Sequence, residues 1–257
     1  MKRYILSLFI LFFCLSNVMA EDAWNTLKST HFVVFYKNAP EDFVKLVTDK
    51  AEVYYDQIAE GLGFMRFDFW LWDNRAKIYI YDDAKIYSAR TGQPAWSLGI
   101  AIPGVKAIET FPYANNFIET VLPHEMGHII FREFVGFNNS GIPLWLDEGV
   151  ASHQEKAKYS QVGIFIRKAM VEGNFMDLKK LASFYSVVNL DPKLVNIFYA
   201  ESFSLIDFLI REFGRDNFVL FCQNLRDKRN LERAMASVYP FGNINELDQA
   251  WQKYLKK

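Results

Sequence analysis

Hydrophobic and polar positions follow a strand-like pattern in the first half of the chain, interrupted by one amphipathic helix. Residues 31–37 and 76–81 are short runs rich in β-branched and aromatic side chains, which predict two strands. Between them, apolar residues recur at helical spacing from Phe43 onward, and this pattern stops at Gly61 and Gly63. A proline and two acidic residues just before Phe43 are typical of a helix start.

Two further strand-like runs, at residues 96–102 and 105–111, flank Pro103 and Gly104 and predict a hairpin. A short helix that stops near Gly92 precedes this hairpin. Helical periodicity then dominates the second half of the chain. The predicted helices cover residues 115–134, 145–156, 162–172, 196–213, 217–225, 231–238 and 246–255.

The order of these elements predicts an α+β fold with a single domain at residues 21–257. A small mixed or antiparallel sheet lobe, residues 21–113, precedes a helical lobe, residues 114–257. Pro123 lies inside the first helix of the second lobe and removes one backbone hydrogen bond. We therefore expect that helix to be kinked, or to be regular only from Pro123 onward.

The first 20 residues have the pattern of a secretory signal peptide. Lys2 and Arg3 precede an apolar run, and small residues before the expected cleavage point after Ala20 complete the pattern. The apolar run is shorter than the ~20 residues of a typical membrane span, which favours cleavage over an uncleaved anchor. A lipid anchor on Cys14 is disfavoured by the phenylalanines before it. We expect an exported protein, periplasmic or extracellular, with no stable membrane span after cleavage.

Composition limits the kinds of partner and the disulfide bonds that can be expected. The 257 residues are 51% hydrophobic, and 29 basic against 30 acidic side chains give a net charge of −1. Removing residues 1–20 removes two basic groups, so 27 minus 30 gives −3. A nearly neutral surface offers no electrostatic case for nucleic acid as a partner. Cleavage also leaves Cys222 as a single cysteine, which excludes an internal disulfide.

One pentapeptide in the first helix of the second lobe, HEMGH at residues 124–128, carries metal-binding chemistry. His124 and His128 lie one helical turn apart on one face, so both imidazoles can reach a single ion. Glu125 is rotated by roughly 100° from His124, where its carboxylate can take a proton from a water bound to the ion. Without an ion, the two histidines could pair with carboxylates instead.

A third ligand has two candidates in the segment PLWLDEGVA, residues 143–151. Asp147 and Glu148 are adjacent there, and either could complete a catalytic zinc site with three protein ligands and one open position. Gly127 interrupts the metal-binding helix, although glycine costs about 1 kcal/mol relative to alanine inside a helix. We expect another element to pass close to the helix at Gly127.

The two motifs together resemble those of the glutamate-zincins, and in particular the peptidase MA-like group of small exported bacterial proteins. The resemblance is specific over residues 123–151 and loose over residues 30–215, including the early strand and the segment from Tyr199 to Ser202. It implies a thermolysin-like zincin catalytic domain. It also implies zinc as the cofactor, bound by three ligands, with the intervening glutamate as the general base. The implied zinc ligands are His124, His128 and Glu148, and the implied general base is Glu125.

Further roles are implied by the same resemblance. Tyr199 would stabilise the oxyanion of the reaction, although an ordinary buried tyrosine is the competing interpretation. Peptide would bind along an edge strand between Trp96 and Phe111, unless that hairpin only packs against the body of the protein. His153 is near enough to Glu148 in the sequence to support it from outside. Relatives often have an acidic residue one turn after the third ligand, where this chain has Ser152, and this leaves the orientation of the two histidines unexplained.

These observations lead to one hypothesis and two rivals. We expect an exported zinc metallopeptidase that hydrolyses peptide bonds with a zinc-bound water and a glutamate general base. A non-catalytic, metal-bearing module that binds a peptide or a partner is the first rival. The second is an exported structural protein that carries the motif by chance and binds no metal.

Overall fold

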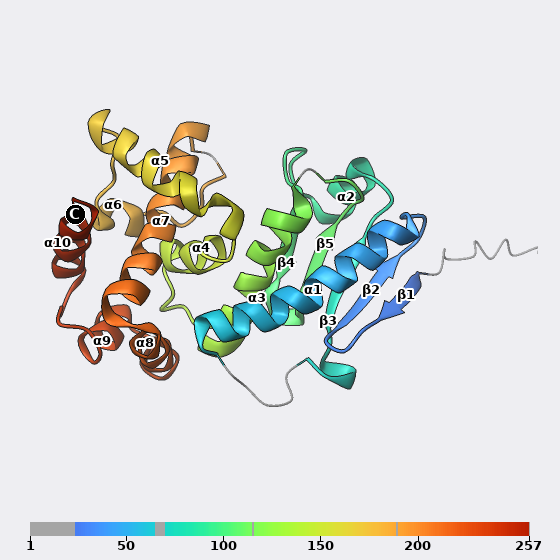
Figure 1. Cartoon of the computed structure of the whole chain (residues 1–257), viewed down its shortest axis with the longest axis horizontal. Coiled ribbons are helices and arrows are strands. Elements are labelled where there is room, and N and C mark those ends of the chain that lie inside the picture. Colours follow the sequence, from blue (N-terminus) through green and yellow to red (C-terminus); the bar gives the residue numbers. More distant parts are fainter. Residues whose placement is uncertain (1–23, 65–69, 115, 189, 257) are drawn as a thin grey trace, which may run out of the picture.

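The structure is a computed structural model, and it describes residues 24–64, 70–114, 116–188 and 190–256. A sheet-bearing part and a purely helical part lie next to each other along the long axis of the molecule (Figure 1). The predicted α+β class is therefore confirmed. The predicted signal peptide, including Cys14, lies outside the described residues.

Five strands form one mixed sheet in the order β1-β2-β3-β5-β4. Their bounds are β1 Asn25–Lys28, β2 Phe32–Tyr36, β3 Ala76–Ile80, β4 Gly99–Ile102 and β5 Ala107–Thr110. The inner pairs β2–β3 and β3–β5 are parallel, whereas β1 and β4 are antiparallel to their neighbours. The strand β1 was not predicted, because all four of its side chains are exposed and its sequence shows no apolar alternation.

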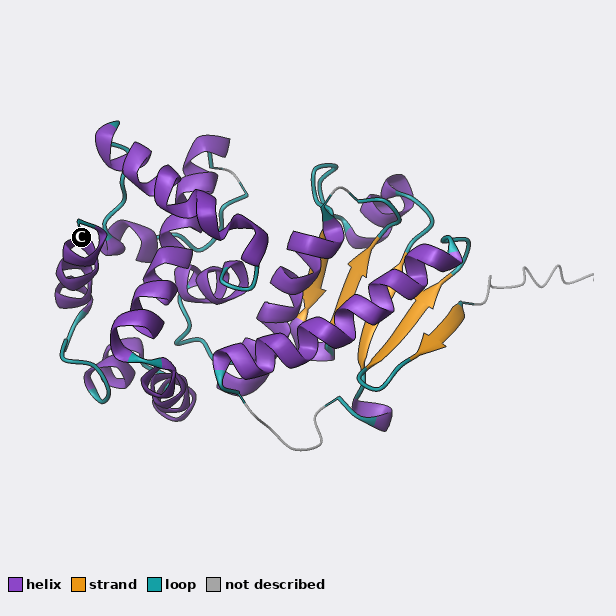
Figure 2. Cartoon of the chain, viewed as in Figure 1, coloured by secondary structure: helices purple, strands orange, loops and turns teal. Residues whose placement is uncertain are grey.

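Two long helices cover one face of this sheet (Figure 2). They are α1 (Glu41–Leu62) and α3 (Leu122–Val135). Phe32 and Val34 of β2 and Ile78 of β3 are fully buried, and they belong to the same core as the apolar face of α1. The alternate residues of β2 and β3 are more exposed, as expected for a sheet with one covered face.

The predicted hairpin is confirmed as β4 and β5, joined by the short helical turn η2 (Pro103–Val105). Lys106 follows the turn in the left-handed region, with φ of 52°. At the other end of the hairpin, Thr110 Oγ1 donates to the carbonyl of Leu98 at 2.8 Å. In the sheet order β4 is an outer strand, and α3 packs beside it.

The helix that carries HEMGH begins with a π-helical turn, η3 (Phe117–Val121), and is α-helical from Leu122. Pro123 thus falls in the first turn of α3, where the missing amide hydrogen costs no intrahelical bond. Of the two predicted possibilities, the regular helix that starts at the proline is the one observed.

The sheet part also contains the short helix α2 (Ala84–Thr91) and the turn η1 (Trp72–Asn74). The rest of the described chain is helical. The remaining elements are α4 Leu144–Ser152, η4 Lys156–Lys158, α5 Tyr159–Val171, α6 Leu178–Ala182, α7 Pro192–Phe213, α8 Arg215–Lys228, α9 Leu231–Ala236 and α10 Ile244–Leu255. Among them, α4 packs against both α3 and α7. The short α6 was not predicted. Across the described part of the chain, no helix combines the length and apolarity that a membrane crossing requires.

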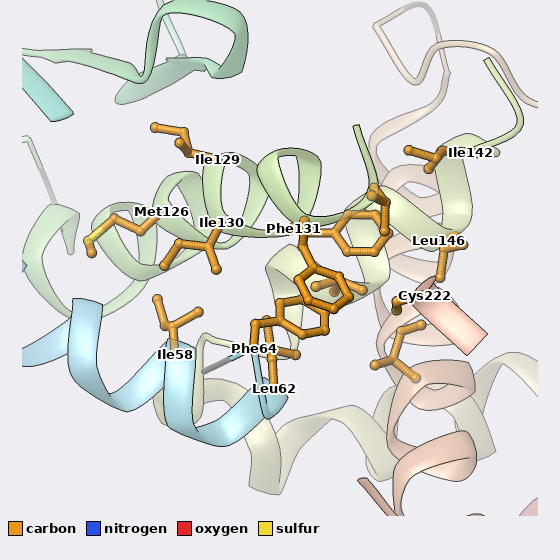
Figure 3. Close-up of a cluster of buried hydrophobic side chains, with 14 of the residues drawn as sticks. Ile58, Leu62, Phe64, Met126, Ile129, Ile130, Phe131, Ile142, Leu146 and Cys222 are labelled. Carbon is orange, nitrogen blue, oxygen red and sulfur yellow. The ribbon is translucent and has the colours of Figure 1, made fainter. Parts of the chain in front are cut away.

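A continuous apolar core joins the sheet part to the helical part. Figure 3 shows Ile58 and Leu62 of α1 beneath Ile130 and Phe131 of α3, with Cys222 of α8 nearby. Phe64 stacks on Phe134 with ring centroids 3.9 Å apart. Cys222 is a buried free thiol within this core. This shared core holds α3 between the two parts of the molecule.

Candidate metal centre

The helix α3 presents both histidines of the motif to one point. The Nε2 atoms of His124 and His128 are 3.2 Å apart, and the two rings meet edge to face at 81°. Each side chain is only 13% exposed. The spacing of four residues places them on one helix face, as the sequence predicted.

Helix α4 brings Glu148 to the same point. Glu148 Oε2 lies 3.4 Å from His124 Nε2 and 3.5 Å from His128 Nε2. Close packing at two glycines permits this approach. A Cβ on Gly127 would lie 3.0 Å from Ala151 Cα in α4, and one on Gly149 would lie 2.5 Å from the carbonyl oxygen of Ser202 in α7. The expected close approach to Gly127 is thus confirmed, and α4 is the element that makes it.

The three converging atoms form a group that could hold a metal ion. Their mutual distances are 3.2, 3.4 and 3.5 Å. Ligands at three corners of a tetrahedron around an ion at about 2.0–2.2 Å would be separated by roughly 3.3–3.6 Å. Within the described structure, Glu148 Oε2 is buried and has no hydrogen-bond partner. The donor set and its spacing therefore fit a divalent ion such as zinc.

A carboxylate lies close to the Nδ1 atom of each histidine. Glu155 Oε1 lies 2.8 Å from His124 Nδ1, and Asp147 Oδ1 lies 3.3 Å from His128 Nδ1. Since an ionised carboxylate only accepts hydrogen bonds, the bond with Glu155 means that His124 Nδ1 carries a hydrogen and that its Nε2 keeps a lone pair for an ion. Asp147 is within ion-pair distance of His128 Nδ1. Asp147 also accepts from Arg132 at 2.8 and 3.0 Å, and Glu155 pairs with Lys158. These contacts anchor the outer carboxylates.

The structure also shows where the other candidate residues of the site lie. Asp147 faces the outer nitrogen of His128 and Arg132, so it does not join the converging atoms as a ligand. The outer partner of His124 is Glu155, which the sequence interpretation missed. Its position seven residues after Glu148, just beyond the end of α4, was the available signal. His153 lies elsewhere, with Nε2 3.5 Å from Asp207 Oδ1.

The carboxylates around the two histidines raise the pKa of both. Burial lowers the pKa of both, but the neighbouring carboxylates of Glu148 and Glu155 outweigh it and raise the pKa of His124 to about 9. Charges on Asp147 and Glu148 raise the pKa of His128 well above its ordinary value. Burial raises the pKa of Glu148, yet the two histidines hold it well below its usual range. An ion would take the place of these protons.

Glu125 lies beside the three converging residues and is tied to the edge strand. Its Oε2 accepts a hydrogen bond from the backbone amide of Ala101 in β4 at 2.7 Å. This amide points away from β5, since it donates to a side chain of α3 instead of the strand ladder. The sequence gave no sign of this bond, because it joins residues 24 positions apart and involves only the backbone of Ala101.

Tyr199 of α7 is brought to the same place. Its ring centroid lies 6.1 Å from that of His124, and the side chain is half-buried. Burial, followed by the charges of Glu148 and Glu125, raises the pKa of its phenol well above the ordinary value. Tyr199 is thus a neutral hydrogen-bond donor at physiological pH.

A cavity of about 470 Å³, which we call the site cavity, opens beside these residues. His124, Glu125 and Tyr199 contribute to its wall. The other lining residues come from the approach to β4, the start of the motif helix, the segment after α4, and helices α5 and α7. They are Trp96, Ser97, Leu98, Gly99, Thr120, Val121, Ser152, Glu155, Lys158, Gln161, Val162, Phe165, Asn196, Ala200 and Phe203.

Comparison with known families gives one match. The model of a family described as the Peptidase MA superfamily matches residues 72–257. The match begins before β3 and includes the edge hairpin, both motif-bearing helices and all later helices. No curated protein matches the chain.

Proposed function

The chain belongs to the peptidase MA superfamily, and from this premise we propose that it is an exported zinc metallopeptidase of the HExxH…E type. Superfamily membership supports a peptidase in general. The observation that carries the finer proposal is the convergence of His124 Nε2, His128 Nε2 and Glu148 Oε2 within 3.5 Å of one another. Two imidazoles and one carboxylate, with a fourth position open, form one of the known donor sets of catalytic zinc.

Zinc bound there would supply Lewis acidity toward the scissile carbonyl and would lower the pKa of a bound water. Glu125 would accept a proton from the attacking water and deliver it to the leaving amine. Its hydrogen bond from Ala101 fixes one carboxylate oxygen, which leaves the other to act. Tyr199, held neutral by burial and nearby charges, would donate to the oxygen that gains charge in the transition state.

We propose that the substrate is an extended peptide that adds to β4. This strand is at the edge of the sheet, and its Ala101 amide already points away from β5 toward Glu125. Residues of an antiparallel strand alternate between the two sides, so Gly99 shares the outward side with Ala101. A peptide added there would lie directly beside Glu125.

The proposal of export rests on the signal-peptide pattern of the first 20 residues. Cys222 is fully buried, so the protein exposes no described thiol in an oxidising compartment. Mass analysis of protein recovered from outside the cytoplasm tests this part of the proposal. A mature chain that begins at Glu21 is the expected result, and an intact N-terminus would contradict cleavage.

The central experiment compares the mature chain with Glu125→Gln. We expect about one zinc per chain in both, and a loss of peptide hydrolysis by roughly 100- to 10,000-fold in the variant, because the general base is removed. Glu119→Gln is the matched control, since this exposed glutamate precedes the motif and pairs with Lys50. A Glu125→Gln protein that hydrolyses peptides as fast as its parent would refute the mechanism.

A metal-bearing peptide-binding module without turnover is the second candidate. It is favoured by one observation, namely that the proposed base is already engaged by the amide of Ala101. Full zinc occupancy, tight peptide binding and no product after long incubation would establish this alternative.

A further inference from the structure

We propose that the outward face of α5 docks on the surface of an anionic lipid membrane, with its basic side chains at the headgroups and its exposed aliphatic side chains inserted beneath them. This inference goes beyond the proposed peptidase function and does not depend on it, because it concerns binding and not hydrolysis. Three observations carry it, namely the local charge around α5, the side chains on its outward face, and a hollow beside it.

The chain is basic around α5 although it is acidic elsewhere. Residues 156–171, KAKYSQVGIFIRKAMV, contain four basic and no acidic side chains. Of the 27 basic groups in residues 21–257, 27 minus 4 leaves 23 for the remainder, against 30 acidic groups. The positive charge is therefore a local feature of this segment, and it attracts a negatively charged surface to one place on the molecule.

The outward face of α5 combines aliphatic and basic side chains. Ile166 and Ala169 are the buried residues of this helix, which packs on α7. Helical spacing places Ile164, Arg167 and Val171 on the opposite face. Ile164 is 59% exposed and Val171 is 89% exposed. Figure 1 shows α5 at the upper edge of the helical part, so this face is at the outside of the molecule.

A hollow of about 260 Å³ between α5 and the start of α7 continues this surface. Its apolar lining residues are Phe165, Ala169, Pro192 and Ile197. Lys168 and Lys193 line it as well, and both pair with Glu172, with Nζ to carboxylate distances of 3.9 and 2.7 Å. Two cations thus share one carboxylate at an apolar hollow, which leaves an excess of positive charge beside apolar surface.

An anionic lipid surface fits both features at once. Its headgroups would pair with Arg167 and Lys168. Ile164 and Val171 would enter the boundary between the headgroups and the acyl chains. A nucleic acid or an acidic polypeptide would satisfy the charges, but it offers no apolar layer for the aliphatic side chains. Because α5 also lines the site cavity through Val162, docking would hold that cavity within roughly 10 Å, one helix diameter, of the lipid.

Flotation of the mature chain with lipid vesicles tests the docking without any need for turnover. One set of vesicles is phosphatidylcholine alone, and the other contains about one third phosphatidylglycerol. We expect the anionic vesicles to bind the protein at least about 20-fold more tightly, because each basic side chain at such a surface contributes roughly fivefold. The Glu125→Gln protein should bind like its parent, so failure of docking and failure of hydrolysis are distinguishable.

A double variant of α5 assigns the electrostatic part. Arg167→Gln combined with Lys168→Gln should weaken binding to the anionic vesicles by roughly 10- to 25-fold. Lys85→Gln combined with Arg90→Gln is the matched control, because these exposed residues of α2 lie in the sheet part and give the same change in net charge. The control should stay within about threefold of the parent.

A single substitution assigns the apolar part. Ile164→Gln should weaken vesicle binding by roughly five- to tenfold, since part of an aliphatic side chain no longer leaves water. Leu220→Gln is its control, because Leu220 is 44% exposed on α8. All the substituted side chains are exposed, so thermal unfolding should not change, and this separates loss of docking from loss of folding.

Several results would overturn the inference. Equal binding to the two kinds of vesicle, or equal losses for the α5 and α2 double variants, would remove α5 as the docking face. Unchanged binding of Ile164→Gln would exclude insertion. Retention of the protein by immobilised polyglutamate, with no binding to either kind of vesicle, would assign the basic segment to an acidic polypeptide and reject the membrane.

Discussion

The sheet part and the helical part of this protein differ most in the polar groups that they bury. Among the described residues, the buried polar side chains of the sheet part are hydroxyls, namely Thr48, Ser97 and Thr110. The helical part buries the carboxyl groups of Asp147, Glu155 and Glu201, which are 8%, 5% and 0% exposed. Buried charge is costly unless it is paired, so its presence marks where function has constrained the fold.

Two of these three carboxyls are paired and the third is not. Asp147 and Glu155 stand behind the histidines and bind Arg132 and Lys158. Glu201 accepts only from the amide of Met176, while its Oε2 has no partner in the described structure. We therefore expect the paired carboxyls to matter for metal binding, and Glu201 to matter for stability.

The largest effect is expected at Glu148, the proposed zinc ligand that the helical part supplies. Glu148→Ala should lower zinc affinity by roughly 1,000-fold, since the ~10–16 kcal/mol typical of structural zinc sites would be shared among three protein ligands. Zinc titration against a competing chelator measures this change. An unchanged affinity would show that the histidines bind the ion with another partner.

Because of Glu201, the free energy of unfolding should fall as pH rises above about 5. Burial, with smaller contributions from Asp177 and Asp248, raises its pKa to about 8 from an ordinary value of 4.5. Between these two pKa values, Glu201 of the unfolded chain releases a proton that Glu201 of the folded chain retains. The stabilisation of the folded state by protonated Glu201 is therefore complete below about pH 4.5. It is lost as pH rises through the folded pKa, by roughly 2 to 3 kcal/mol between pH 5 and pH 7.

Denaturant unfolding of Glu201→Gln across this pH range checks the assignment. The variant should lack the fall in free energy of unfolding that the parent shows between pH 5 and pH 7, because an amide does not ionise. Parallel curves for the two proteins would mean that Glu201 is ionised in the folded state.

The paired carboxyls should act through the histidines. Glu155→Gln should weaken zinc binding by roughly 10- to 100-fold, the usual cost of losing an outer partner of a ligating histidine. Glu172→Gln is the matched control, because this glutamate of the helical part pairs with Lys193 away from the centre. Equal zinc affinities of the two variants would contradict the proposed role of Glu155.

The smallest effects are expected for glycine substitutions, one in each part of the molecule. Gly149→Ala should destabilise the fold by about 1 to 2 kcal/mol, because the new Cβ would lie 2.5 Å from the carbonyl oxygen of Ser202. Gly61→Ala in α1 meets nothing within 4 Å and should stabilise the fold by about 0.5 to 1 kcal/mol. Thermal unfolding of both variants measures the difference. Shifts of the same sign would refute the close packing of α4 on α7.

Much of the architecture could be predicted because it depends on local patterns. The strands β2 and β3, the hairpin of β4 and β5, and the helix α1 all follow from periodicity and from Gly and Pro positions. The strand β1 and the helix α6 could not be found this way. The side chains of β1 are exposed, and α6 spans only five residues, so neither carries enough apolar spacing to register.

By itself, the sequence determined the helix-borne pair His124 and His128, because a spacing of four residues places two side chains on one face of any α-helix. Only the tertiary structure places Glu148, and not Asp147, at the Nε2 atoms of both histidines, since adjacent residues on α4 point about 100° apart and α4 packs against α3. The contacts of Glu155 and of the Ala101 amide likewise depend on segments that meet only in the folded chain. Such long-range contacts leave no periodic trace, so folding alone reveals them.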